Sequence, residues 1–149
     1  MTNTREVTIL IAEDDAGHAR LVEKNLSRAG MHNSIQRFAN GQAILDFLFR
    51  RGPGAHRVPG ASYLLLLDIR MPQVDGVEVL RQIKEDPELR KLPVIMLTTT
   101  DDPREVERCH GIGCSSYIVK PVDYEKFAEA IRNLGLYIAL VEVPHITTG

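Results

Sequence analysis

Five residues with a carboxylate, hydroxyl or amine side chain lie at or just after the end of a short apolar segment. They are Asp14, Asp15, Asp68, Thr98 and Lys120. Three carboxylates that lie close together repel one another and favour a hard divalent cation such as Mg²⁺, which prefers oxygen ligands. With the cation bound, one carboxylate can stay ionised and attack a phosphoryl group, giving an aspartyl phosphate. The amine and the hydroxyl would then neutralise or hydrogen-bond the phosphoryl oxygens.

The elements that would position these residues alternate between two patterns. Apolar or β-branched runs, typical of strands, cover residues 7–11, 34–38, 63–67, 94–97 and 116–119. Apolar residues at helical spacing follow each run. The first set is Leu21, Val22, Leu26 and Ala29, ended by Gly30, and Asn40 is the expected N-cap of a second helix that runs to Leu48. A third helix contains Val77, Leu80 and Ile83, a fourth begins with Asp102 as N-cap and Pro103 as first residue, and a long fifth one runs from Asp123 to Ile138. This alternation predicts an α/β fold with a five-stranded parallel sheet flanked by five helices. Ligands bind such sheets beyond the carboxyl ends of the strands, so the five polar residues are expected at one edge.

Composition narrows the possible classes. The chain has 149 residues, 44% hydrophobic and 26% charged, which suits one globular domain. Its net charge of −2 argues against a dedicated nucleic-acid or anionic-membrane binder. No run resembles a secretory signal or a membrane span, and the spacing of Cys109 and Cys114 fits two reduced thiols, so a cytoplasmic location is expected.

Four motifs surround the polar residues. They are Ile11-Ala-Glu13-Asp14-Asp15, Asp68-Ile-Arg70-Met-Pro72-Gln-Val-Asp75-Gly76, Leu97-Thr98-Thr99 and Tyr117-Ile-Val-Lys120-Pro121. With these motifs the chain resembles the receiver domain of two-component response regulators, over about residues 5 to 140. The resemblance implies a flavodoxin-like receiver fold, with the receiver domain at residues 5–142, a tail at 143–149 and no output domain.

The resemblance also implies a role for each matched residue. Asp68 would be the phosphoacceptor. Mg²⁺ would be held by Asp14, by Asp15 as the more direct ligand, by Asp68 and by the backbone carbonyl of Arg70. Thr98 and Lys120 would bind the phosphoryl group, Thr98 and Tyr117 would act as the switch, and Pro121 would follow a cis peptide bond. An aspartate that follows a strand is also a common helix N-cap, and this second interpretation stays open for Asp15.

A narrower resemblance concerns the small single-domain regulators that serve phytochrome-type histidine kinases. It depends on the extended glycine- and proline-rich loop at 51–61, on segments 97–100 and 120–123, and on the tail at 137–144. It implies a sensor histidine kinase, a bacteriophytochrome, as partner, and signalling by protein contact, to a target or onward to a phosphotransfer protein.

The predicted last helix carries more apolar residues than one buried face requires. Leu136, Leu140 and Val143 lie at i, i+4 and i+7 beside the main stripe. We expect them to form an exposed patch that joins two copies in a homodimer, as the narrower resemblance also implies. The alternative is a helix that bends at Gly135 and buries both sets within its own domain.

Three rival functions fit less well. An aspartyl-nucleophile phosphatase of the haloacid dehalogenase type needs an aspartate two residues after the nucleophile, where this chain has Arg70. A nucleotide-binding protein would need a phosphate loop, and Gly52-Pro-Gly54 lacks its lysine. A receiver-like module without phosphorylation would have lost the acceptor, the acidic pair or the lysine. The sequence therefore predicts a phosphoacceptor signalling protein and not an enzyme.

The lifetime of the phosphorylated state can also be predicted. Arg70 and Thr100, each two residues past a site residue, should flank the path of a hydrolytic water. Arginine has no acceptor and cannot act as a base, and threonine orients water less well than a carboxylate or amide. Slow self-dephosphorylation is therefore expected, unless Arg70 points into solvent and contributes only its carbonyl.

Overall fold

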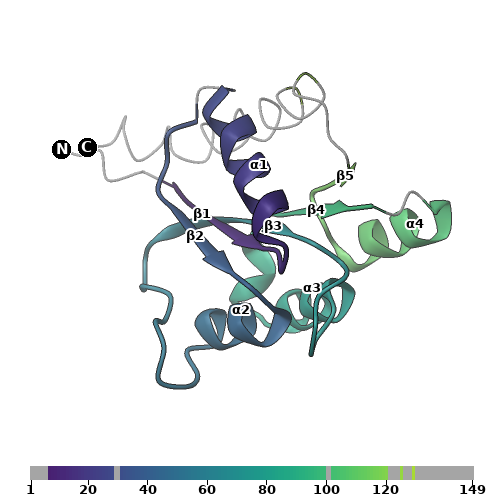
Figure 1. Ribbon diagram of the computed structural model, residues 1–149. Coiled ribbons are helices and arrows are strands. Elements are labelled where there is room, and N and C mark those ends of the chain that lie inside the picture. Colours follow the sequence, from purple (N-terminus) through teal and green to yellow (C-terminus); the bar gives the residue numbers. More distant parts are fainter. Residues whose placement is uncertain (1–6, 29–30, 100–101, 121–124, 126–128, 130–149) are drawn as a thin grey trace, which may run out of the picture.

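A computed structural model describes residues 7–28, 31–99 and 102–120, together with Glu125 and Glu129. Five parallel strands form one sheet in the order β2-β1-β3-β4-β5 (Figure 1). The strands are β1 (Val7–Ala12), β2 (Ile35–Phe38), β3 (Ser62–Leu67), β4 (Val94–Thr98) and β5 (Ser116–Val119). All five carboxyl ends meet at one edge, as the sequence predicted.

Helices cover both faces of this sheet. They are α1 (Ala16–Arg28), α2 (Gly41–Leu48), α3 (Gly76–Glu85) and α4 (Pro103–Ile112), with a 3₁₀ helix η1 (Leu89–Lys91) before β4. Helix α1 packs on one face, and α2, α3 and α4 pack on the other (Figure 1). The predicted fifth helix from Asp123 lies outside the described residues, apart from Glu125 and Glu129.

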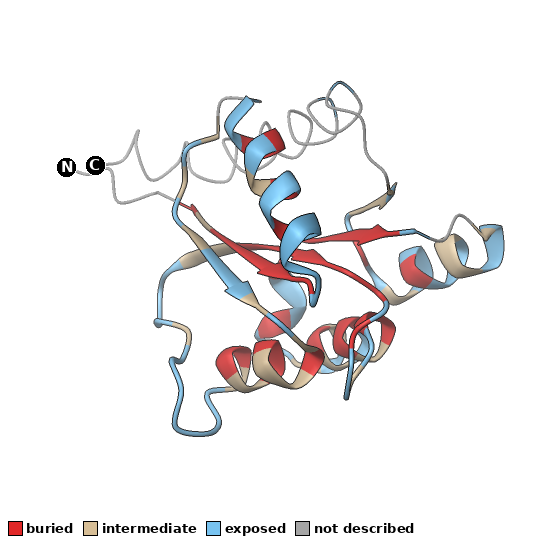
Figure 2. Cartoon of the chain, in the orientation of Figure 1, coloured by how far each residue is buried: buried red, intermediate tan, exposed pale blue. Residues whose placement is uncertain are grey.

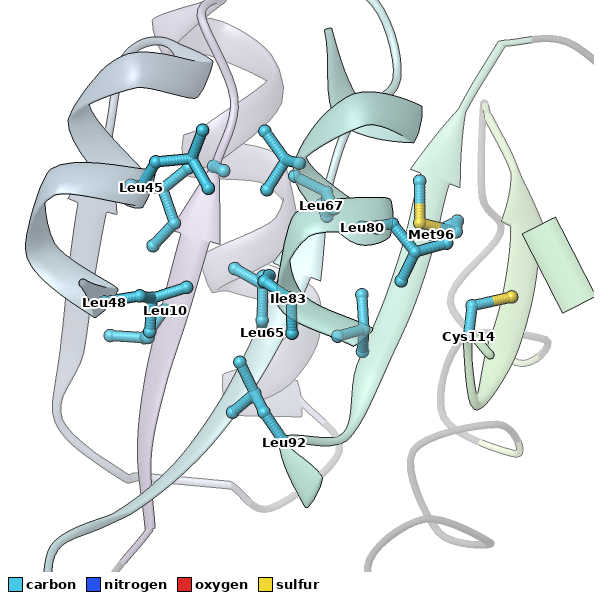
Figure 3. Close-up of a cluster of buried hydrophobic side chains, with 14 of the residues drawn as sticks. Leu10, Leu45, Leu48, Leu65, Leu67, Leu80, Ile83, Leu92, Met96 and Cys114 are labelled. Atoms are coloured by element: carbon cyan, nitrogen blue, oxygen red, sulfur yellow. The ribbon is translucent and has the colours of Figure 1, made fainter. Parts of the chain in front are cut away.

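Side-chain alternation divides the core into two layers. On β3, Leu65 and Leu67 face the helices α2 and α3, while Leu64 and Leu66 face α1. The three inner strands β1, β3 and β4 are buried along most of their length (Figure 2), which explains why their sequences are almost wholly apolar. Figure 3 shows the larger layer, in which leucines of α2, α3 and the strands interdigitate with Met96 and Cys114.

Local capping sets where the helices begin. Asn40, Asp75 and Asp102 each accept a hydrogen bond from a backbone N–H in the first turn of α2, α3 and α4 respectively. Helix α4 ends at Gly113, whose φ of 131° suits only glycine, and the N–H of Cys114 donates to the carbonyl of Cys109. These predicted starts at Asn40 and Asp102 are confirmed.

One detail differs from the sequence prediction, and another adds to it. Leu21, whose spacing places it with the apolar residues of α1, is 48% exposed, because the buried stripe runs through Ala19, Val22 and Leu26. The loop at 51–61 is held at its centre. Arg57 donates from its backbone N–H to Phe47, from Nε to the carbonyl of Leu48, and from Nη2 to Glu88.

Gly76 is required where α3 passes under the end of β3. A Cβ atom at Gly76 would lie 2.1 Å from the carbonyl oxygen of Asp68, whereas a Cβ at Gly111 would meet nothing within 4 Å. Gly76→Ala is therefore expected to lower the free energy of unfolding by about 1–3 kcal/mol, because backbone must move. The matched change Gly111→Ala, within helix α4, should raise it by about 0.5–1 kcal/mol. Urea unfolding followed by circular dichroism measures both. Equal effects of the two substitutions would contradict the close approach.

Candidate functional site

Three carboxylates converge at the carboxyl edge of the sheet. Glu13 and Asp14 directly follow β1, and Asp68 directly follows β3. One carboxylate oxygen from each lies within 4.8 Å of the others. The backbone sets this convergence, because the N–H of Asp68 donates to the carbonyl of Ala12 and so extends the pairing of β1 and β3 to their ends. Glu13 and Asp68 are buried, and Asp14 is exposed.

The ammonium of Lys120, directly after β5, lies inside this acidic cluster. Its Nζ donates to Oε1 of Glu13 at 2.6 Å and lies 3.7 Å from Oδ2 of Asp68. A third contact joins Nζ to Nδ1 of His18 at 3.3 Å. An ammonium has only donors, so the imidazole nitrogen accepts here. With only 10% of its side chain exposed, Lys120 is fixed between the first and last strands.

Burial and charge change the acidity of Asp68. Burial raises its pKa to about 6, Lys120 opposes this rise and the neighbouring Glu13 adds to it. The carboxylate is thus costly to ionise in this position unless more positive charge arrives. At neutral pH a divalent cation would supply that charge.

The acidic pair differs from the pair that the sequence predicted. Asp14 joins Asp68, but Asp15 does not belong to the cluster. Instead Oδ1 of Asp15 accepts a hydrogen bond from the N–H of His18 at 2.9 Å and so caps helix α1. That contact is the main reason the pKa of Asp15 is lowered. Among the described residues Glu13 takes the place in the cluster that the sequence predicted for Asp15, because the carboxylate of Asp15 caps the start of the helix. The role of Asp15 as a metal ligand stays a prediction.

Sequence reasoning assigned no role to Glu13, His18 or Arg37, although all three contact this region. An N-cap accepts a hydrogen bond from the N–H two or three residues further on, so the acidic residue directly before the first residue of α1 caps that helix. The sequence locates this first residue only within a few positions, so it does not choose among the three acidic residues.

The predicted phosphoryl-binding and switch residues lie on β4 and β5: Thr98 ends β4, Tyr117 lies within β5 and Lys120 directly follows it. Thr98 is fully buried, and its carbonyl accepts a hydrogen bond from the N–H of Lys120 at 2.6 Å. Tyr117 is half-buried and packs against the larger core layer, which contains Met96. Met96 of β4 is the residue paired with Tyr117 of β5 in the sheet. Arg70 is exposed, two residues after Asp68. The other predicted positions, Thr100, Pro121, Leu136, Leu140 and Val143, lie outside the described residues.

The donor set fits a hard divalent cation. Carboxylate oxygens from Glu13, Asp14 and Asp68 can approach one ion, and the exposed position of Asp14 leaves access for the waters that Mg²⁺ retains. The described residues contain no competing histidine or cysteine in this group. The cluster therefore suits Mg²⁺ and not a structural zinc ion.

Comparisons with known proteins match the chain to one family. Residues 9–132 match the family model of the response regulator receiver domain. Among curated proteins, a probable methanogenesis regulatory protein, FilR2, of Methanothrix harundinacea is 35% identical over 129 residues, which cover 87% of this chain and 81% of FilR2.

Two solved structures are similar over most of their length. A response regulator receiver domain from Rhodospirillum rubrum is 48% identical with a TM-score of 0.75, covering 90% of this chain and 94% of that one. The bacteriophytochrome response regulator RtBRR is 35% identical with a TM-score of 0.77, covering 87% of this chain and 78% of that one.

This chain belongs to the response regulator receiver family. In that family an aspartate accepts a phosphoryl group in a Mg²⁺-dependent reaction, and the proteins carry signals and are generally not enzymes. Membership implies a histidine kinase as partner. Within the described residues no helix has the length and apolar character needed to cross a bilayer.

The raised pKa of Asp68 predicts that replacing this carboxylate by an uncharged side chain stabilises the fold, and that the gain depends on pH. A folded-state pKa near 6 lies above the unfolded value of 3.8, so ionised Asp68 destabilises the metal-free fold above pH 6, and the penalty disappears as pH falls toward 4. Asp68→Asn should therefore raise the free energy of unfolding by about 2 kcal/mol at pH 8 in a chelator, and by almost nothing at pH 4. Unfolding by urea at both values measures this.

Asp15→Asn is the control for this prediction, because the pKa of Asp15 is lowered and asparagine still caps a helix. It should give no gain at pH 8. A pH-independent effect of Asp68→Asn would show that Asp68 is not strained by ionisation.

Proposed function

We propose that this chain accepts a phosphoryl group on Asp68 from a histidine kinase, with Mg²⁺ held by Glu13, Asp14 and Asp68. The convergence of these three carboxylates around the ammonium of Lys120 carries the proposal. The backbone carbonyl of Arg70, next along the same loop, is the further ligand that the family resemblance implies.

The residues divide the reaction between them. An oxygen of Asp68 attacks phosphorus while the bond from phosphorus to the donor's imidazole nitrogen breaks, so the nitrogen leaves with the electron pair. Mg²⁺, when bound, supplies charge that keeps Asp68 ionised and offsets the charge of the phosphoryl oxygens. Lys120 lies close enough to Asp68 to pair with the transferred group, and the Thr98 hydroxyl at the end of β4 is the expected hydrogen-bond donor to it.

The dependence of phosphorylation on Mg²⁺ concentration should change in Asp14→Asn but not in Asp15→Asn. Asp14→Asn removes a proposed ligand, so the Mg²⁺ concentration for half-maximal phosphorylation by a small phosphodonor should rise at least about tenfold. Asp15→Asn makes the same charge change one residue on but keeps the cap of α1, and should stay within about twofold of wild type. Intact mass spectrometry measures the phosphorylated fraction.

Asp68→Asn completes this experiment, since it should gain no phosphoryl mass at any Mg²⁺ concentration. An equal mass gain in Asp68→Asn would remove Asp68 as the acceptor. Equal damage from Asp14→Asn and Asp15→Asn would restore Asp15 as a ligand.

The proposal includes a partner and an output. The similarity to RtBRR, a bacteriophytochrome response regulator, supports a bacteriophytochrome-type kinase as donor. The proposal also places the reaction in the cytoplasm and includes a phosphotransfer protein as a further recipient. On phosphorylation, Thr98 would move toward the phosphoryl group and Tyr117 would rotate into the vacated space. This change would alter contacts with a target or with a second copy.

A homodimer through Leu136, Leu140 and Val143 is part of this output. Sedimentation of the wild type should show dimers at high micromolar concentration, and Leu140→Glu should be monomeric because it places a charge in an apolar interface. Thr98→Ala should accept phosphate but lose any change in dimer affinity on phosphorylation. A monomeric wild type, phosphorylated or not, would overturn the dimer.

Slow hydrolysis of the aspartyl phosphate is the last part of the proposal. Arg70 is exposed two residues after the acceptor, which by itself also fits the alternative in which its side chain points into solvent. The proposal is that its guanidinium pairs with the phosphoryl group once that group is present and hinders the approach of water. Arg70→Ala should therefore decay several-fold faster than wild type after removal of the phosphodonor. Arg90→Ala, in η1 at the opposite edge of the sheet, is the control. Identical decay of wild type and Arg70→Ala would show that this side chain does not set the lifetime.

A further inference from the structure

Arg37 reaches from the end of β2 to the backbone that carries the acidic pair. Its Nε donates to the carbonyl of Glu13 at 3.0 Å, and its Nη2 donates to the carbonyl of Asp14 at 2.9 Å. The guanidinium fork thus spans two consecutive peptide groups. No role for Arg37 follows from the receiver motifs, none of which contains it.

These bonds lie just beyond the last hydrogen bonds that pair β1 with β2. The last paired residues of β1 and β2 are Ala12 and Phe38, and one further bond runs from the N–H of Glu13 to the carbonyl of Phe38. Beyond it, the N–H of Asp15 donates to Oε2 of Glu13 at 3.1 Å, and the next point fixed from outside this segment is the cap that Asp15 provides to α1. Between these two points, Arg37 fixes the carbonyls of both acidic residues.

We infer that Arg37 is a positioning residue for the metal site, which holds the backbone of Glu13 and Asp14 so that their carboxylates meet that of Asp68. This inference rests on the proposed function, since it concerns the Mg²⁺ affinity of the same cluster. A planar fork loses little freedom on forming two parallel bonds, so arginine suits this role better than lysine. Outer partners of metal-binding groups commonly change affinity by 10 to 100-fold.

The direction in which Mg²⁺ affinity changes on replacing Arg37 distinguishes a positioning role from a simple effect of its charge. If only the charge of Arg37 mattered, its removal would strengthen the binding of a nearby cation, because like charges repel. If Arg37 fixes the backbone, its removal weakens Mg²⁺ binding. The carboxylates are then ordered only when the ion binds, and the entropy lost on ordering them lowers the affinity. The two effects therefore move the Mg²⁺ dissociation constant in opposite directions.

Isothermal titration of the unphosphorylated full chain with Mg²⁺ tests the inference. Arg37→Met keeps the length of the side chain but removes its donors, and should weaken binding about tenfold. Arg37→Lys keeps the charge without the fork and should recover only a small part of the loss. Arg81→Met is the matched control, because Arg81 is an arginine of α3 that pairs only with Glu78 and Glu85 among the described residues. It should bind within about twofold of wild type.

A second measurement excludes a general loss of structure. Arg37 is exposed, so the urea midpoint of Arg37→Met in a chelator should stay close to that of Arg81→Met. Unchanged or tighter Mg²⁺ binding by Arg37→Met would overturn the inference, as would full recovery by Arg37→Lys. A wild type that binds no Mg²⁺, or an Asp14→Asn variant that binds as tightly as wild type, would instead overturn the proposed function.

Discussion

The ion pair between Lys120 and Glu13 is the contact on which the rest of the site depends. It joins the end of β5 to the end of β1 at 2.6 Å, and both side chains are almost completely shielded from water. The pair offsets part of the repulsion within a cluster of three carboxylates, of which Asp68 already ionises with difficulty. Breaking a shielded pair of this kind by removing one partner leaves an uncompensated charge, so neither residue can be changed independently of the other.

The sheet explains how distant residues reach this pair. Parallel strands place all their carboxyl ends at one edge. The strand after β1 is added on one side of it, as β2, and the next strand, β3, is added on its other side. Ligands commonly bind such sheets outside the point where the connections change sides, and it is here that Glu13, Asp14 and Asp68 meet. The close approach of Gly76 to the carbonyl of Asp68 fixes the start of α3 under the acceptor, so the motif around Asp75 and Gly76 is a packing device as much as a chemical one.

Most of the architecture was predictable because it depends on local rules. The bounds of β5 are those predicted, the caps at Asn40 and Asp102 form, and the apolar run of β3 is buried on both faces. The site was predictable in type but not in every member. Which of three adjacent acidic residues faces Asp68 depends on where helix α1 begins, and apolar spacing locates a helix start only within a few residues.

The contact of Arg37 with two carbonyls could not have been found from the sequence. It depends on the register of β1 against β2, which pairs Ile11 with Arg37, and no pattern in either strand specifies this pairing. Likewise, the exposure of Leu21 reflects the exact rotation of α1 on the sheet. Both are tertiary properties, fixed only when neighbouring elements pack together.

The span of the chain between Glu13 and Lys120 has a consequence for folding. Their contact closes a loop of 107 residues, and Asp68 lies near its middle. Contacts of such high sequence separation are expensive in chain entropy and form only after the intervening strands have paired. No partly folded intermediate that lacks β5 can bring the ammonium to the acceptor. The chain can therefore accept a phosphoryl group only when the sheet is complete, and an incompletely folded chain in the cell would transmit no signal.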